Sequence, residues 1–183
     1  MKRVFLIHGL GGHPEENWLP WLKNELEKKG LKVIVPAMPD TSHPKQSAWV
    51  KHLAATVGTP DKDCIFVGHS LGCTAILRYL ETLEENQEIG GCIFVAGVHE
   101  NLGIKEIKNF FEKPFDWDKI KSRCRRFIAL HSDNDPYAAL RTGDVFRKSL
   151  NAEVIIRHLG HFNVASGVTE LPVVLESVLK IIK

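Results

Sequence analysis

The sequence has few of the features that mark a protein for a membrane, for export or for nucleic acid. No stretch reaches the roughly eighteen apolar residues that a membrane-spanning helix requires. The apolar run at 4–7 is too short for a secretory signal. The net charge is only +2, from 24 basic and 22 acidic residues, so no large positive field could hold a nucleic-acid backbone. We therefore expect neither a membrane nor a nucleic acid as partner.

Cysteine is also scarce. The four cysteines, at positions 64, 73, 92 and 124, form neither a C-x-x-C pair nor a zinc-binding spacing. Cysteines of this kind are typical of reduced core residues in a cytoplasmic protein. We expect a cytoplasmic location, no metal and no organic cofactor.

What the sequence does contain is an ordinary globular composition, with 44% apolar and 25% charged residues in 183. A chain of this length can bury roughly 70% of its unfolded surface. We expect a single domain over 1–183.

Short continuous apolar runs alternate with longer amphipathic segments, as in a parallel sheet covered by helices on both faces. The pattern predicts an α/β fold with a doubly wound, mostly parallel six-stranded sheet. The expected strands are 3–8, 32–35, 63–68, 91–96, 126–131 and 153–157, and the expected helices are 15–29, 46–57, 70–85, 136–149 and 168–182.

One connection, 98–125, is longer than the others and rich in aromatic residues. It contains Phe110, Phe111, Phe115 and Trp117. Long connections inside small domains are usually functional. We interpret this one as a short cap over a pocket, with filling of the edge of the core as the alternative.

The expected strand 63–68 ends in Gly68-His-Ser-Leu-Gly72, a G-x-S-x-G pattern. This pattern is typical of a nucleophile elbow, a strand-to-helix turn so tight that its flanking positions leave no room for a Cβ. A chance turn is the alternative, so the remaining residues must decide. Ser70 is the candidate nucleophile, and it needs a base and an acid to activate it.

Both partners are available after later strands, in the order Ser, Asp, His. Asp133 and Asp135 follow the strand 126–131, and we favour Asp135 because Pro136 could open the next helix. His158 and His161 follow the last strand, and we favour His161 because His158 still belongs to the strand. A metal site at His158-x-x-His161 is the alternative, but no further ligand pattern accompanies it. The carboxyl ends of parallel strands meet at one edge of the sheet, so the three residues can form a catalytic triad.

An acyl-transfer site also needs two backbone N–H groups for the oxyanion. We expect one from Leu71, directly after the nucleophile, and the other from Leu10 in the glycine-rich loop His8-Gly-Leu-Gly-Gly12. A phosphate cradle is the alternative for this loop. It lacks the third glycine of a dinucleotide fingerprint and the G-K-[ST] of a P-loop.

Several segments of the chain match one family closely. They are NWLPWLKNEL (17–26), MPD (38–40), AWV (48–50), GHSLG (68–72), FDWDKIK (115–121), DNDP (133–136) and GHF (160–162). The chain thus resembles the small α/β-hydrolase-fold serine hydrolases related to retinoblastoma-binding protein 9. The resemblance implies a minimal cap and a triad of Ser70, Asp135 and His161. The segment ATVGTPDKDC (55–64) lacks a Leu-x-Cys-x-Glu motif, so binding of a retinoblastoma-type protein is not expected.

These observations together predict a serine hydrolase that cleaves a carboxylic ester, thioester or amide through an acyl-enzyme on Ser70. The substrate would be a small molecule or short peptide carrying an acyl group. Its pocket could be walled by Trp18, Trp49, Phe111 and Trp117, although the tryptophans could equally belong to the core. A non-catalytic binding module on the same fold is the alternative, and the sequence does not separate a hydrolase from an acyltransferase.

Overall fold

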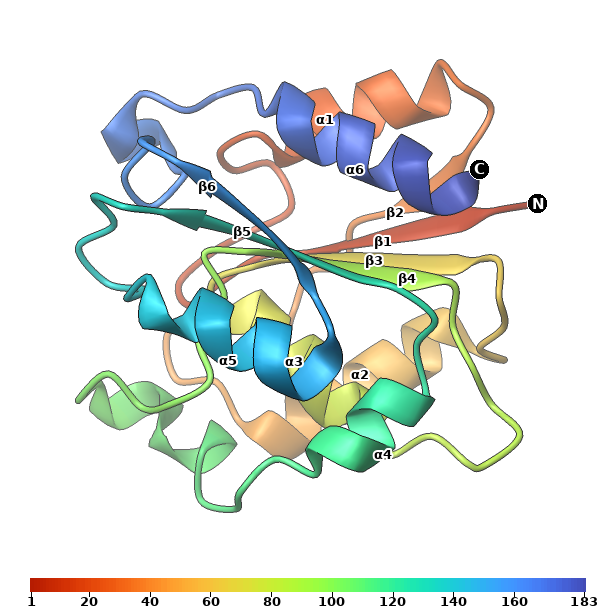
Figure 1. Cartoon of the computed structure of the whole chain (residues 1–183), viewed down its shortest axis with the longest axis horizontal. Coiled ribbons are helices and arrows are strands. Elements are labelled where there is room, and N and C mark those ends of the chain that lie inside the picture. Colours follow the sequence, from red (N-terminus) through yellow and green to blue (C-terminus); the bar gives the residue numbers. More distant parts are fainter.

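The computed structural model of the chain describes residues 1–183 and contains one six-stranded sheet between two layers of helices (Figure 1). All neighbouring strands are parallel, which confirms the predicted α/β fold. The strand order is β2-β1-β3-β4-β5-β6. The strands are β1 (Arg3–Ile7), β2 (Lys32–Ile34), β3 (Cys64–His69), β4 (Gly91–Val95), β5 (Phe127–Ser132) and β6 (Glu153–Arg157).

The helices divide unequally between the two faces of the sheet. In Figure 1, α1 (Leu19–Glu27) and α6 (Pro172–Ile182) lie above the sheet. The helices below it are α2 (Gln46–Val57), α3 (Leu71–Leu80), α4 (Trp117–Ser122) and α5 (Arg141–Leu150). Two short 3₁₀ helices, η1 (Lys105–Phe110) and η2 (Val164–Ser166), lie in the connections. None of these helices is long and apolar enough to cross a membrane.

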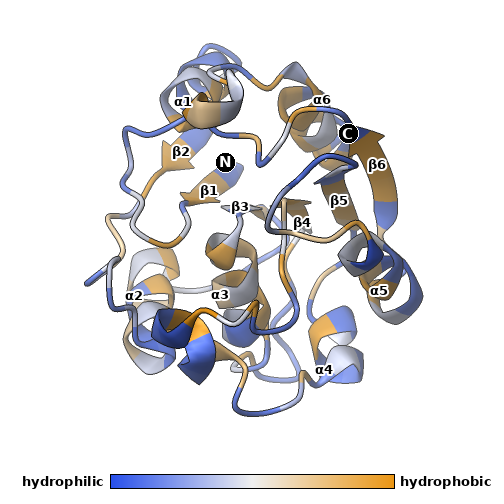
Figure 2. Cartoon of the chain, turned by 90° about the vertical axis from the view of Figure 1, so that its left-hand side faces the viewer, coloured by the Kyte–Doolittle hydropathy of each residue, from blue (hydrophilic) through white to orange (hydrophobic).

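The core has two parts, one on each face of the sheet. Side chains alternate along a strand, so Phe5 and Ile7 of β1 join the part below the sheet while Val4 and Leu6 join the part above it. Phe5 stacks on Phe66 of β3 with ring centroids 4.9 Å apart. Figure 2 shows the strands largely in the hydrophobic colour, as expected when both faces are covered. All four cysteines are buried and free.

Several helices are shorter than their sequence patterns predict. Helix α1 begins at Leu19 rather than at 15, because Pro20 lacks an N–H and is tolerated only in a first turn. Pro172 likewise begins α6, where the prediction was 168. Pro136 does not open α5, which begins five residues later at Arg141. Helix α3 ends at Leu80 rather than at 85.

The connection 98–125 contains η1 and α4 and packs against the part of the core below the sheet. Ile107, Phe110 and Ile120 are buried there, and Phe111, Phe115 and Trp117 are partly buried against the core. Its first half also borders the cavity described below. The segment therefore contacts both the core edge and the cavity.

Candidate active site

Ser70 occupies the tight turn between β3 and α3. Its backbone has φ 52°, in the left-handed region that residues with a side chain rarely adopt. Its N–H donates to the carbonyl oxygen of Val95 on β4, at 2.9 Å. The strand β4 thus helps to hold the turn in this conformation.

The glycines on either side of Ser70 are required by close backbone contacts. A Cβ at Gly68 would lie 2.7 Å from the nitrogen of Cys73, and a Cβ at Gly72 would overlap the carbonyl oxygens of Ile7 and His8. Helix α3 can therefore begin directly against the end of β1. This packing aims the start of α3 at the carboxyl edge of the sheet, as a nucleophile elbow requires.

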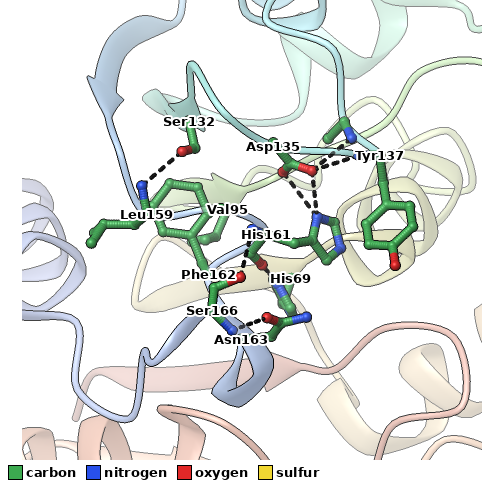
Figure 3. Close-up of polar contacts among 12 residues, drawn as sticks. His69, Val95, Ser132, Asp135, Tyr137, Leu159, His161, Phe162, Asn163 and Ser166 are labelled. Atoms are coloured by element: carbon green, nitrogen blue, oxygen red, sulfur yellow. Dashed lines mark hydrogen bonds and ion pairs between the residues drawn. The ribbon is translucent and has the colours of Figure 1, made fainter.

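His161 and Asp135 form a hydrogen-bonded pair beside this turn (Figure 3). His161 Nδ1 lies 2.9 Å from Asp135 Oδ2 and 3.0 Å from Oδ1. The Asp135 side chain is fully buried and the His161 side chain is 11% exposed. Asp135 Oδ1 also accepts from the N–H groups of Tyr137 and Ala138, at 2.8 and 3.0 Å.

These contacts keep the Asp135 carboxylate ionised. Burial by itself would raise the pKa of Asp135, but the hydrogen bond and charge of His161 and the two backbone N–H groups outweigh it and lower the pKa overall. An ionised acceptor at Nδ1 holds the proton of His161 on that nitrogen. Nε2 is then left as the nitrogen that can accept a proton.

The alternative partners, Asp133 and His158, form a separate pair on the surface. His158 Nδ1 lies 2.6 Å from Asp133 Oδ1, and the two side chains are 75% and 51% exposed. His158 and His161 therefore contact different carboxylates. No group of three or more His, Cys, Asp or Glu residues is placed to hold a metal ion.

Ser132, the last residue of β5, and Asn134 in the loop after it connect this loop to the loop that carries His161. Ser132 Oγ accepts from the N–H of Leu159 at 2.8 Å, and Asn134 Oδ1 accepts from the N–H of Gly160 at 2.8 Å. Ser132 also donates to Asn134, at 2.6 Å. Neither residue was predicted to have a role, although both lie within three residues of Asp135.

His69, the residue before Ser70, supports the same loop from inside. Its Nε2–H donates to the carbonyl oxygen of His161 at 2.8 Å, and its ring lies edge-on to Trp18 at 5.8 Å. Burial, and next the charge of His161, lowers the pKa of His69 to about 4. His69 is therefore neutral and positions the backbone of the base.

Ser70 and His161 line one cavity of about 300 Å³. The structure contains no hydrogen bond between Ser70 Oγ and His161 Nε2. In ligand-free sites such bonds are often long and shorten only in the substrate complex. Asp135 lies behind His161, outside the cavity wall.

Leu10 and Leu71 border the same cavity. Leu71 is the first residue of α3, where backbone N–H groups have no partner within the helix. The Leu10 N–H donates no hydrogen bond within the chain. The loop that carries it is fixed by His8, whose Nε2 accepts from the N–H of Met38 and whose Nδ1–H donates to the carbonyl of Gly9, both at 3.2 Å.

The four aromatic residues expected as pocket walls do not line this cavity, so the prediction of an aromatic pocket wall was wrong. Trp18 and Trp49 are fully buried, and their indole N–H groups donate to the carbonyls of Phe162 and Pro39, at 2.9 and 2.7 Å. Phe111 and Trp117 instead pack on either side of Phe115, at 6.3 and 4.9 Å between ring centroids.

Both apolar and polar residues line the cavity. Four of the apolar residues come from 98–107, and the polar residues come from the loops after β1 and β6 and from the turn around Ser70. Tyr137 stands at the cavity 58% exposed, with its ring edge-on to His161 at 5.0 Å. The apolar lining residues are Leu10, Leu71, Val98, Leu102, Ile104, Ile107 and Tyr137, and the polar ones include Glu16, Asn17 and Asn163.

A sequence model of a family described as serine hydrolase matches residues 4–180. The Bacillus subtilis (strain 168) protein YdeN, named as a hydrolase, is 30% identical over 177 residues, which cover 96% of this chain and 93% of YdeN. The serine hydrolase RBBP9 of Rattus norvegicus is 27% identical over 166 residues, 87% of each chain.

Solved structures agree with this result. The crystal structure of the ydeN gene product of B. subtilis has a TM-score of 0.95 at 29% identity, and the match covers 100% of this chain and 99% of that one. Est1E from Butyrivibrio proteoclasticus has a TM-score of 0.76 at 16% identity, covering 99% and 88% of the two chains. The likeness to Est1E is one of fold.

Proposed function

Since the chain belongs to the serine hydrolase family, we propose that it cleaves a carboxylic ester, thioester or amide through an acyl-enzyme formed on Ser70. The observation that carries the proposal is the hydrogen bond between His161 Nδ1 and the buried Asp135 carboxylate. It leaves Nε2 free to accept a proton in the cavity that Ser70 also lines. Membership of the family favours this enzyme over the non-catalytic binding module.

In the first half of the reaction, Ser70 Oγ attacks the carbonyl carbon of the substrate and its proton passes to His161 Nε2. The carbonyl oxygen becomes an oxyanion, which accepts hydrogen bonds from the N–H groups of Leu10 and Leu71. The imidazolium then protonates the leaving oxygen, sulfur or nitrogen. The bond to the leaving group breaks, and the acyl group stays on Ser70 as an ester.

In the second half, His161 Nε2 takes a proton from a water molecule that attacks the acyl carbon. The oxyanion forms again at the same N–H groups, and the proton returns through His161 to Ser70 Oγ as the acid leaves. We propose a small molecule or short peptide as the acyl substrate, because the cavity of about 300 Å³ suits a ligand of that size. A cytoplasmic location stays a prediction from the cysteine pattern.

The proposal is tested by covalent labelling with a fluorophosphonate probe, read by intact mass. We expect the wild type to gain one adduct, Ser70→Ala to gain none, and His161→Ala to react about 10³-fold more slowly. Ser47→Ala and His158→Ala, which change exposed residues outside the cavity, are the matched controls and should label at the wild-type rate. Absence of labelling in folded wild type, or labelling that survives in Ser70→Ala, contradicts the proposal.

A further inference from the structure

The cavity contains one carboxylate that the proposed mechanism does not use, that of Glu16. This residue is partly buried and borders the cavity together with Ser70 and His161. None of the thirteen ion pairs of the chain includes it. The cavity wall contains no lysine or arginine, and the titratable side chain that acts on the Glu16 carboxylate is the exposed His13. The carboxylate is therefore without a strong counter-charge.

The backbone around Glu16 holds the carboxylate over the glycine-rich loop. A Cβ at Gly12 would overlap this carboxylate, so glycine leaves the space that the carboxylate occupies. The next residue, Asn17, has φ 53° and accepts from the N–H of Val164 at 2.9 Å. This contact joins the loop of Glu16 to the loop that follows His161. Glu16 thus lies over Gly12, in the cavity that Leu10, the candidate oxyanion donor, also lines.

The position of Glu16 has an electrostatic consequence for the reaction. Burial raises the pKa of Glu16, while His13 and the backbone N–H groups of Gly9 and His13 oppose the rise. An ionised carboxylate near a developing oxyanion disfavours the transition state, because the two negative charges repel. A positive charge on the substrate would remove this repulsion and give Glu16 a partner.

We propose that Glu16 determines specificity by selecting esters and thioesters that carry a compact ammonium group in the same cavity. The inference rests on the proposed function, since it concerns the substrate of the same site. The ammonium would lie against Glu16, Asn17 and Asn163, and apolar parts of the substrate would pack on the apolar residues of 98–107. Substrates with a carboxylate or phosphate near the cleaved bond would be excluded by the same charge.

The test compares two thioesters of equal shape, acetylthiocholine and 3,3-dimethylbutyl thioacetate, which differ by a quaternary nitrogen in place of a carbon. Thiol release gives kcat/KM for each. We expect the wild type to prefer the cationic thioester by about tenfold, because Coulomb attraction between the quaternary nitrogen and a partly buried carboxylate is of that order. Glu16→Gln should bring the ratio close to one, and the matched control Glu15→Gln, at an exposed neighbouring position, should keep it.

The dependence of the substrate preference on ionic strength is a second test, and it uses the wild type alone. Raising the salt concentration from about 0.01 M to about 1 M should reduce the preference of the wild type, because a partly exposed charge pair is screened. The same change should leave the rate with the neutral thioester nearly constant. If Glu16→Gln does not fold, the salt dependence of the wild type tests the proposal instead. A preference unaffected by salt overturns the proposal.

The proposed role of Glu16 is also overturned if the wild type has equal kcat/KM for both thioesters, or if Glu16→Gln leaves the ratio of the two values unchanged. Turnover of neither thioester overturns it as well, because the cavity then does not accept the ammonium. The fluorophosphonate adduct on Ser70 separates these results from a failure of the proposed function. If the adduct forms, the proposed hydrolase function stands and only the specificity for an ammonium group is excluded. If no adduct forms, both proposals are excluded.

Discussion

Asp135 shows how much of the candidate site depends on a single side chain. Its carboxylate accepts from His161 Nδ1 and from two backbone N–H groups, and it is fully buried. Asparagine would keep the shape of the side chain but present an N–H group to the N–H of His161. The imidazole would then be held in the other tautomer, with its proton on the nitrogen that should accept one.

We therefore expect Asp135→Asn to lower kcat by about 10³–10⁴-fold. The measurement is the steady-state rate with a p-nitrophenyl ester, together with the urea unfolding midpoint to show that the variant is folded. Asp133→Asn is the matched control, because Asp133 contacts only the exposed His158, and it should change kcat by less than about twofold. A folded Asp135→Asn with wild-type kcat would exclude a role for this pair in the reaction.

At the residue scale, the sequence predicted some site residues and missed others. The choice of Asp135 agrees with the pair seen in the structure, but the reason given for it was wrong, since Pro136 does not open a helix and two backbone N–H groups fix the carboxylate instead. Glu16 was missed because it fell inside the predicted helix 15–29. Pro20 indicates that this helix begins later than residue 15, because proline is favoured only in the first turn of a helix.

At the scale of elements, Arg78 holds the connection 98–125 against α3. Its side chain is 6% exposed, and its guanidinium stacks on Phe115 at 3.9 Å. It pairs with Glu81 at 2.9 Å, and Glu81 also accepts from the N–H of Asp116. The guanidinium also donates to three carbonyl groups of the connection, those of Phe110, Lys113 and Pro114. A residue of the core helix thus positions the segment that supplies the apolar wall.

We expect Arg78→Met to lower the free energy of unfolding by about 3 kcal/mol, because it leaves buried carbonyl oxygens without donors. Limited proteolysis should then cut within 98–125, where the wild type resists. The matched control is Arg125→Met, whose exposed ion pair with Glu88 should contribute less than about 1 kcal/mol. Equal urea midpoints for Arg78→Met and Arg125→Met would show that the contacts of Arg78 do not hold the segment.

The strands were better predicted than the segments between them. The four inner strands, β1, β3, β4 and β5, are short buried apolar runs, and burial of both faces of a parallel sheet makes such runs continuous and easy to recognise. The connection 98–125 depends on distant contacts, such as the guanidinium of Arg78 with the carbonyl of Phe110. A sequence pattern does not contain such a contact. The expected aromatic walls Trp18 and Trp49 lie in the core, and the residues of 98–107 that line the cavity are aliphatic.

At the scale of the whole molecule, two buried imidazoles couple folding to pH. Burial lowers the pKa of both His69 and His131 to about 4, against an ordinary value of 6.5. His131 is fully buried, and neither of its ring nitrogens has a hydrogen-bond partner. Between these pH values the unfolded chain binds protons that the folded chain does not. Stability is therefore complete above about pH 6.5 and is lost as the pH falls toward 4.

We expect the free energy of unfolding to fall by about 2 kcal/mol for each of these two residues between pH 7 and pH 5. Urea denaturation at the two pH values measures the change. His131→Leu replaces an unpartnered imidazole with an apolar side chain, so it should reduce the pH dependence by the contribution of His131, about 2 kcal/mol, without loss of stability at pH 7. A wild type equally stable at pH 7 and pH 5 would show that these groups do not titrate as buried neutral imidazoles.

The cavity draws its lining from residues as far apart as Gly9 and Asn163. During synthesis on the ribosome, the loops that carry Leu10, Ser70 and Tyr137 emerge well before His161. No nascent or prematurely ended chain that stops short of this histidine can contain the complete set. Activity would therefore require a chain that extends past His161.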